Sequence, residues 1–138
     1  MPTAITPHIN FQGNARQALS FYHSVFGGQL SIVSYEHAGK ADAASASDDV
    51  MWGQVMNETG FRIMAYDVQA NKTWHPGENA VYIVLESNTT DEMNCYWNKL
   101  NESAEILQPL LPSPWSPLYG MLKDKFGTVW VCSVAPGV

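Results

Sequence analysis

The feature that most constrains this chain is a repeat, because a strand, a turn and a helix occur near residue 8 and again near residue 80. A shift of 74 residues aligns the two helices and the polar turn before each one. Three of four aligned helix positions keep an apolar or aromatic side chain. Two amphipathic helices can also overlap by chance, but the shared element order favours a duplicated module. The aligned pairs are Leu19 with Met93, Tyr22 with Tyr96, His23 with Trp97, and Phe26 with Leu100.

Each module is predicted to have the element order β-α-β-β-β within one α+β domain spanning residues 1–138. Module one covers about residues 4–67 and module two about residues 80–135. Mixed or antiparallel sheets of this kind would curl into a partly open barrel, with the helices outside and a concave face inside. One helix is expected at 15–26 and a second after a capping box at 89–92. A short apolar stretch at 106–111 and a proline-rich loop at 111–117 follow the second helix. The expected strands are 7–11, 29–37, 50–56, 61–66, 80–86, 118–123 and 128–134.

The charge balance excludes a dedicated nucleic-acid binder. The 138 residues include 7 Lys and Arg against 13 Asp and Glu, a formal net charge of −6, whereas phosphate binding depends on clustered basic side chains. No segment is apolar for long enough to span a bilayer and residues 1–8 lack the features of a secretion signal, so we expect a cytoplasmic protein with no membrane partner. Cys95 and Cys132 lie in apolar segments without CxxC spacing and are expected to be buried, reduced thiols.

Five short motifs carry a resemblance to a known superfamily, namely Asn10–Ala15, Ala18–Tyr22, Val25–Gly28, Tyr119–Gly120 and Asp124–Trp130. Over about residues 5–134 the chain resembles the vicinal oxygen chelate superfamily, and within it the PhnB-like branch of glyoxalase and bleomycin-resistance proteins. The resemblance implies the paired-module fold and a homodimer. It does not choose an activity, because the superfamily includes isomerases, dioxygenases, antibiotic-modifying enzymes and sequestering proteins.

Members of this superfamily that use a metal place ligands on the first and last strand of each module. The matching positions in this chain are His8, Met64, Tyr82 and Val131. Only His8 is a good ligand for a divalent ion, and Asp67, the nearest carboxylate, has the wrong strand parity. Because catalytic metal sites commonly use three protein donors, we predict that the chain holds no metal and needs no cofactor.

Strand alternation predicts which side chains line the concave face. If His8 faces inward, Ile9 and Phe11 pack beneath the helix. Arg62 shares the inward parity, and because a buried charge without a partner is costly, it either meets an anionic ligand or an acidic side chain or points to solvent from an edge. Of these, we expect it to point to solvent. Trp115 stands where PhnB-like relatives carry a tryptophan before their Tyr-Gly motif. The predicted ligand-binding residues are His8, Asn10, Trp52, Gln54, Met64, Tyr66, Tyr82, Trp115 and Tyr119.

Stacking on tryptophan and tyrosine rings, with a few hydrogen bonds, favours a flat organic ligand. The leading hypothesis is a homodimeric protein that binds a small organic molecule in an aromatic-lined cavity without metal, with catalysis left open. One alternative is a metal-dependent lyase, isomerase or dioxygenase of glyoxalase type that uses His8. Another is a dimeric interaction module whose cavity is filled by its own side chains. The sequence contains no nucleophile elbow and no methyl-donor fingerprint.

Overall fold

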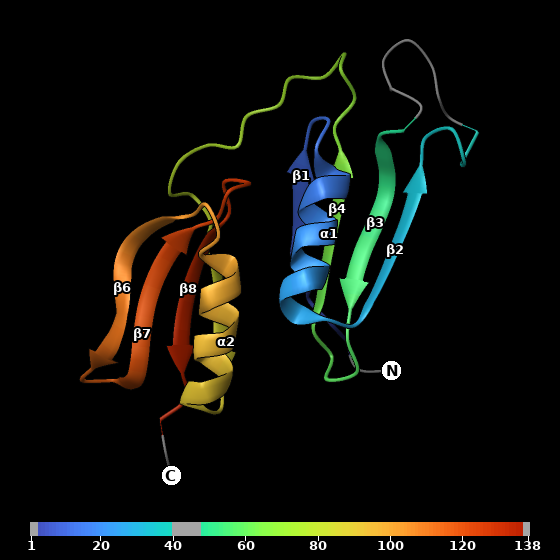
Figure 1. Cartoon of the computed structure of the whole chain (residues 1–138). Coiled ribbons are helices and arrows are strands. Elements are labelled where there is room, and N and C mark those ends of the chain that lie inside the picture. Colours follow the sequence, from blue (N-terminus) through green and yellow to red (C-terminus); the bar gives the residue numbers. More distant parts are fainter. Residues whose placement is uncertain (1–2, 40–47, 137–138) are drawn as a thin grey trace. The chain divides into compact units, whose positions relative to one another are not determined.

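The chain forms two compact units, residues 1–76 and residues 77–138. The structure, a computed structural model, describes residues 3–39 and 48–136. Each unit holds one helix and one four-stranded mixed sheet in the order β-α-β-β-β (Figure 1). This order was predicted from the repeat, and it confirms the α+β class. Among the described residues, no helix has the length and apolar character needed to cross a membrane.

The first unit has a sheet that is open at both edges. Its strands lie in the order β1-β4-β3-β2. β1 runs parallel to β4, whereas β4 with β3 and β3 with β2 are antiparallel. The elements are β1 (His8–Phe11), α1 (Ala15–Phe26), β2 (Gln29–Ser34), β3 (Val50–Met56) and β4 (Arg62–Asp67).

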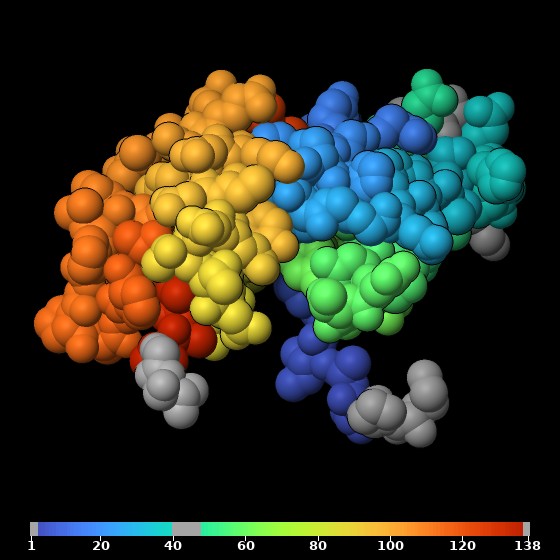
Figure 2. Space-filling model, turned by 60° about the horizontal axis from the view of Figure 1, so that its bottom comes forward, coloured from blue at the N-terminus to red at the C-terminus, as the bar shows by residue number. Residues whose placement is uncertain are grey.

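α1 covers one face of this sheet. Its buried residues recur at helical spacing, as predicted, and include Ala15 and Leu19. Gly53 of β3 lies directly beneath the helix, because a Cβ there would collide with the Leu19 side chain. After the helix, Gly28 has a φ of +87° and passes against the Met56 backbone, where no side chain would fit. Figure 2 shows this end of the unit, with the helix end in blue beside the β3–β4 turn in green.

One buried carboxylate, that of Asp67 at the end of β4, joins three segments of the first unit. Its Oδ1 accepts hydrogen bonds from the backbone N–H groups of Gly13 and Ala15, each at 2.9 Å. Its Oδ2 accepts from the backbone N–H of Val50, at the start of β3, at 2.8 Å. Asn14, the N-cap of α1, makes no side-chain cap bond. Asp67 therefore satisfies the free donors at the helix start from a different strand.

Removal of this carboxylate should destabilise the fold strongly. In Asp67→Ala three backbone N–H groups lose their acceptor, and we expect the free energy of unfolding to fall by about 3 kcal/mol or more. Urea denaturation followed by circular dichroism measures the change. Asp48→Ala, at an exposed carboxylate of the same unit, is the control and should change stability by less than about 0.5 kcal/mol. Equal effects of the two substitutions would contradict the role given to Asp67.

Asp49 lies beside this centre and gives stability a pH dependence. Burial raises its pKa above the ordinary value of 3.8, and the charges of Asp67 and Asp48 raise it further. The folded chain therefore binds this proton more tightly than the unfolded chain does. The stability that results is complete below pH 3.8 and is lost as the pH rises through the folded pKa.

Asp49→Asn carries no charge at this position at any pH. We expect this variant to be more stable than the parent at neutral pH, and the advantage to shrink as the pH is lowered through the raised pKa of Asp49 to its ordinary value of 3.8. Urea midpoints measured at both pH values test this. An advantage that is absent at neutral pH, or that grows on acidification, would show the sign to be wrong.

The second unit repeats the arrangement. Its strands lie in the order β5-β8-β7-β6, and β5 runs parallel to β8. The helix begins where the capping box predicted, since the Thr89 hydroxyl accepts a hydrogen bond from the Glu92 backbone N–H at 3.2 Å. The elements are β5 (Ile83–Ser87), α2 (Thr90–Leu100), β6 (Glu105–Ser113), β7 (Ser116–Lys123) and β8 (Val129–Val134).

The Asp-Lys-Phe-Gly motif forms the turn between β7 and β8. Asp124 Oδ1 accepts from the backbone N–H groups of Phe126 at 2.9 Å and Thr128 at 3.0 Å. Its Oδ2 accepts from Trp130 Nε1 at 2.9 Å, and both Asp124 and Trp130 are buried. This motif, which carried part of the resemblance, therefore stabilises the β7–β8 turn through the hydrogen bonds of Asp124.

The proline-rich loop expected at 111–117 is wrong. β6 continues to Ser113 and β7 begins at Ser116, so only Pro114 and Trp115 lie between the strands. Ser113 Oγ accepts from the Ser116 backbone N–H at 3.1 Å and closes this short turn. β6 is an edge strand, where a proline can replace an N–H that faces solvent without breaking the ladder. A proline-rich segment can therefore extend as a strand at this edge.

The two cysteines match the prediction only in part. Both are free thiols. Cys132 is buried on β8, and burial raises its pKa to about 12. Cys95, by contrast, is exposed on α2. Met93 and Trp97 of this helix are buried, and Cys95, which lies between them in the sequence, falls on the solvent-facing side of the helix.

Candidate functional site

Six of the nine predicted binding residues lie on one side of the first sheet. We call this side, opposite α1, the open face. Strand pairing sets His8 opposite Met64 and Met64 opposite Gln54, so these side chains form a row across three strands. Asn10 pairs with Tyr66 in the next row. The six residues are His8, Asn10, Trp52, Gln54, Met64 and Tyr66.

The imidazole of His8 is oriented by two neighbours. Its Nδ1 lies 2.7 Å from Asn10 Oδ1. Because this amide oxygen can only accept, Nδ1 carries the proton, and Nε2 of the neutral ring is an acceptor. The ring meets Tyr66 edge-on, with the centroids 5.5 Å apart. His8 is exposed, so Nε2 is the atom through which a ligand donor can reach this ring.

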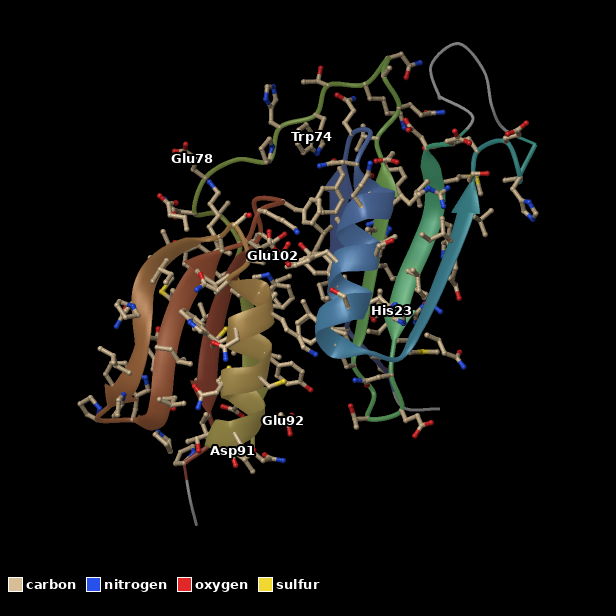
Figure 3. All side chains as sticks on the ribbon, viewed as in Figure 1. His23, Trp74, Glu78, Asp91, Glu92 and Glu102 are labelled. Carbon is tan, nitrogen blue, oxygen red and sulfur yellow. The ribbon has the colours of Figure 1, made fainter. Side chains whose placement is uncertain are left out.

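Trp74 fixes the segment that follows β4. Its Nε1 donates to the Asn10 backbone oxygen at 3.0 Å, and Figure 3 shows Trp74 beside the end of β1. Gln12 Nε2 adds hydrogen bonds to the carbonyl oxygens of Gln69 at 3.1 Å and Lys72 at 3.2 Å. Trp74 was not among the predicted site residues, although a lone tryptophan in a polar segment is a signal for such an anchor.

Arg62 also belongs to the open face, and the expectation that it turns to solvent is wrong. The residue is half-buried, and its Nε donates to Gln54 Oε1 at 2.9 Å. Its backbone pairs with Met56, one row from the His8, Met64 and Gln54 row. The partner of the Arg62 side chain in this contact is therefore the neutral amide of Gln54 and not a carboxylate.

The three remaining predicted residues belong to the second unit. Tyr119 on β7 pairs with Ser133 of β8, and its ring meets Trp115 edge-on with the centroids 5.2 Å apart. Trp115 lies between β6 and β7 and is 60% exposed. Tyr82 precedes β5, and its hydroxyl donates to Asn79 Oδ1 at 2.7 Å. The second unit thus brings Trp115 and Tyr119 together as an aromatic pair and engages Tyr82 with Asn79.

The residues at the metal-ligand positions do not fit a divalent ion. His8 pairs with Met64, but Val131 pairs with Val84 and not with Tyr82. The counterpart of His8 is therefore Val84, a shift of 84 − 8 = 76 residues in this strand, although the helices align at 74. One imidazole, one thioether and two valines supply a single good donor for a hard or borderline cation.

Other histidines do not complete this set. His37 and His75 are exposed, and His23 on α1, labelled in Figure 3, has its Nε2 3.0 Å from the Gly28 carbonyl oxygen. Across residues 3–39 and 48–136, no three side chains of His, Cys, Asp or Glu come together in a metal-binding group. The donor chemistry of the described chain therefore gives no support to a metal centre built on His8.

His8 alone should not retain metal. After incubation with Zn²⁺ and removal of the free ion, we expect less than about 0.1 zinc per chain, because a single imidazole binds too weakly to survive the exchange. Elemental analysis by mass spectrometry measures the content. His8→Ala and the exposed-site control His37→Ala should match the parent. Near-stoichiometric zinc that is lost in His8→Ala and kept in His37→Ala would establish a metal site.

The paired β-α-β-β-β units define a glyoxalase-like α+β protein. A glyoxalase family protein from Bacillus cereus shares this fold with a TM-score of 0.63 over 99% of this chain and 96% of that one, at 15% identity. Residues 3–133 match the family model described as 3-demethylubiquinone-9 3-methyltransferase. The chain belongs to this family, and its fold is the glyoxalase-like fold that the resemblance to the vicinal oxygen chelate superfamily implied.

More similar proteins cover nearly the whole chain. Protein PA1353 from Pseudomonas aeruginosa is 28% identical with a TM-score of 0.85, over 97% of this chain and 98% of that one. A Bacillus cereus protein described as a PhnB protein is 28% identical with a TM-score of 0.74, over 96% and 100%. Protein YjdN from Escherichia coli is 22% identical over 94% of both chains.

Proposed function

We propose that this chain binds a small organic molecule with a flat ring on the open face of its first unit, through ring contacts and hydrogen bonds rather than through a metal. The observation that carries the proposal is the single row formed by His8, Met64 and Gln54. An imidazole, a thioether and an amide stand side by side on three paired strands. A ring can lie on the thioether while its polar atoms reach the imidazole and the amide.

The rigidity of this row supports binding. His8 is oriented by Asn10 and by the edge-on contact with Tyr66, and Gln54 is engaged by Arg62. Side chains that are already ordered lose little further freedom when a ligand binds. The face therefore resembles a prepared binding surface more than a row of free side chains.

Two further elements belong to the same proposal. The aromatic pair of Trp115 and Tyr119 is proposed as a second place for ring stacking, because Trp115 is largely exposed. A homodimer is proposed from the resemblance, and native mass spectrometry of the purified protein reports its subunit number together with any co-purified ligand.

The methyltransferase in the family description does not extend to this proposal. Nucleotide-type methyl donors are commonly held by doubly wound parallel sheets, at the point where the strand order reverses. The two sheets of this chain are instead mixed, in the orders β1-β4-β3-β2 and β5-β8-β7-β6. The geometry supports recognition of a ligand and assigns no group that would transfer a methyl.

The probe N-phenyl-1-naphthylamine, a neutral flat arene, tests this function. We expect saturable quenching of tryptophan emission by the probe, and the same affinity in EDTA, because stacking and apolar burial need no ion. Tyr66→Ala should weaken the affinity by about fivefold or more. Tyr96→Ala, on α2 of the second unit, is the matched control and should leave it unchanged.

The two alternatives predict different outcomes. Binding that is abolished by EDTA and restored by Zn²⁺ would replace the proposal with a metal-dependent activity. A chain that shows no saturable binding while it assembles into a stable dimer would instead be an interaction module.

A further inference from the structure

We propose that the ligand of the open face is an aromatic acid, a flat ring that bears a carboxylate or sulfonate, and that Arg62 is the residue that selects it. This inference rests on the proposed function, because it names the class of molecule that the same face would take. The observations behind it are the half-buried position of Arg62 and its hydrogen bond to Gln54.

The guanidinium of Arg62 is held in place, and most of its donors are unused among the residues that the structure describes. Its Nε donates to Gln54 Oε1 at 2.9 Å, and this bond orients the planar group. The two terminal nitrogens carry four more N–H donors, arranged as a fork that matches the two oxygens of a carboxylate or sulfonate. Because Gln54 accepts through its oxygen, its amide N–H₂ also remains a donor for the same anion.

The surroundings of Arg62 lack a compensating negative charge. Within the described part of the chain, Arg62 has no ion-pair partner, and the one acid in strands β1 to β4 is Asp67. The carboxylate of Asp67 is directed to the start of α1 and the start of β3, away from the open face. Glu58 is exposed in the β3–β4 turn. A half-buried cation without an acidic partner on its face favours an anionic ligand at that position, against the net charge of −6 of the whole chain.

The spacing of the face explains why the anion should carry a ring. Arg62 and Met64 are two residues apart on one side of β4, which places them about 7 Å apart along the strand. His8 stands opposite Met64. An acid group bound at Arg62 would therefore place an attached ring over Met64, with one edge toward His8. A small inorganic anion would use the Arg62 fork but leave the rest of the row unoccupied.

Two probes that share one ring system separate the charge from the ring. 8-Anilinonaphthalene-1-sulfonate has the arene of N-phenyl-1-naphthylamine with an added sulfonate. By fluorescence titration we expect the parent protein to bind the sulfonate at least about fivefold more tightly than the neutral probe, as a charge-assisted hydrogen bond at a half-exposed site would give. In Arg62→Met this preference, the ratio of the two affinities, should fall to within about twofold, whatever change the loss of the Gln54 contact makes to the affinity for the neutral probe.

The two arginines of the chain provide a matched control. Arg16 is exposed on α1, where its Nη2 donates to the Asp48 carbonyl oxygen at 3.1 Å. Arg16→Met removes the same charge and should keep the preference for the sulfonate. Arg62→Lys keeps a charge on the open face and should retain part of the preference. Circular dichroism establishes that each variant is folded.

The outcomes distinguish the inference from the function on which it rests. Equal affinity of the parent for both probes, or a preference that survives Arg62→Met, would overturn the role of Arg62 while leaving ring binding intact. If both Arg62→Met and Arg16→Met lose the preference for the sulfonate, the preference comes from net charge, and this result would also overturn the role of Arg62. If neither probe binds the parent saturably, the proposed function itself fails.

Discussion

The open face depends on the buried carboxylate of Asp67, on the other side of the same sheet. That carboxylate joins the turn after β1, the first residue of α1 and the first residue of β3 to the end of β4. The parallel pairing of β1 with β4 is therefore fixed at the helix side, and this pairing sets His8 beside Met64. A one-residue slip of β1 would turn His8 beneath the helix and bring Ile9 to the open face. The register of the open face is thus set by a buried group on the opposite side of the sheet.

The fold keeps the positions at which superfamily members are expected to hold a metal, but their chemistry has changed. His8 still stands beside the last strand of its module, and Val84 stands beside Val131 in the second. With a thioether and two valines in place of oxygen and nitrogen donors, the positions offer apolar contact area instead of ligands for an ion. Arg62 supplies a fixed positive charge one row away.

The sequence predicted the elements better than the details that depend on pairing. The predicted bounds of α1 and β3 agree with the structure, because hydrophobic periodicity is a local property of the sequence. Strand alternation is local too, and it correctly placed His8, Gln54 and Met64 on one side of the sheet. The β6–β7 hairpin was missed because a proline-rich segment is typical of a loop. Proline is tolerated in a strand at the edge of a sheet, and the edge position of β6 is known only from the strand order. Tyr82 was assigned as the counterpart of His8 because one offset was applied to helix and strand alike. The orientation of Arg62 could not be predicted, since its partner is fixed by register between two strands.

A methyl NMR titration of methionine-labelled protein most directly tests whether the chain recognises a ligand by ring contact and charge or by metal. One sample is titrated with 8-anilinonaphthalene-1-sulfonate and a second sample with Zn²⁺. Met64 and Met56 lie in adjacent rows of the open face, whereas Met93 belongs to α2 of the second unit and is buried. We expect the aromatic acid to shift the Met64 and Met56 methyl signals and to leave that of Met93 in place, and we expect Zn²⁺ to move none of the three signals. Shifts at Met64 caused by Zn²⁺, with none caused by the aromatic acid, would contradict this account.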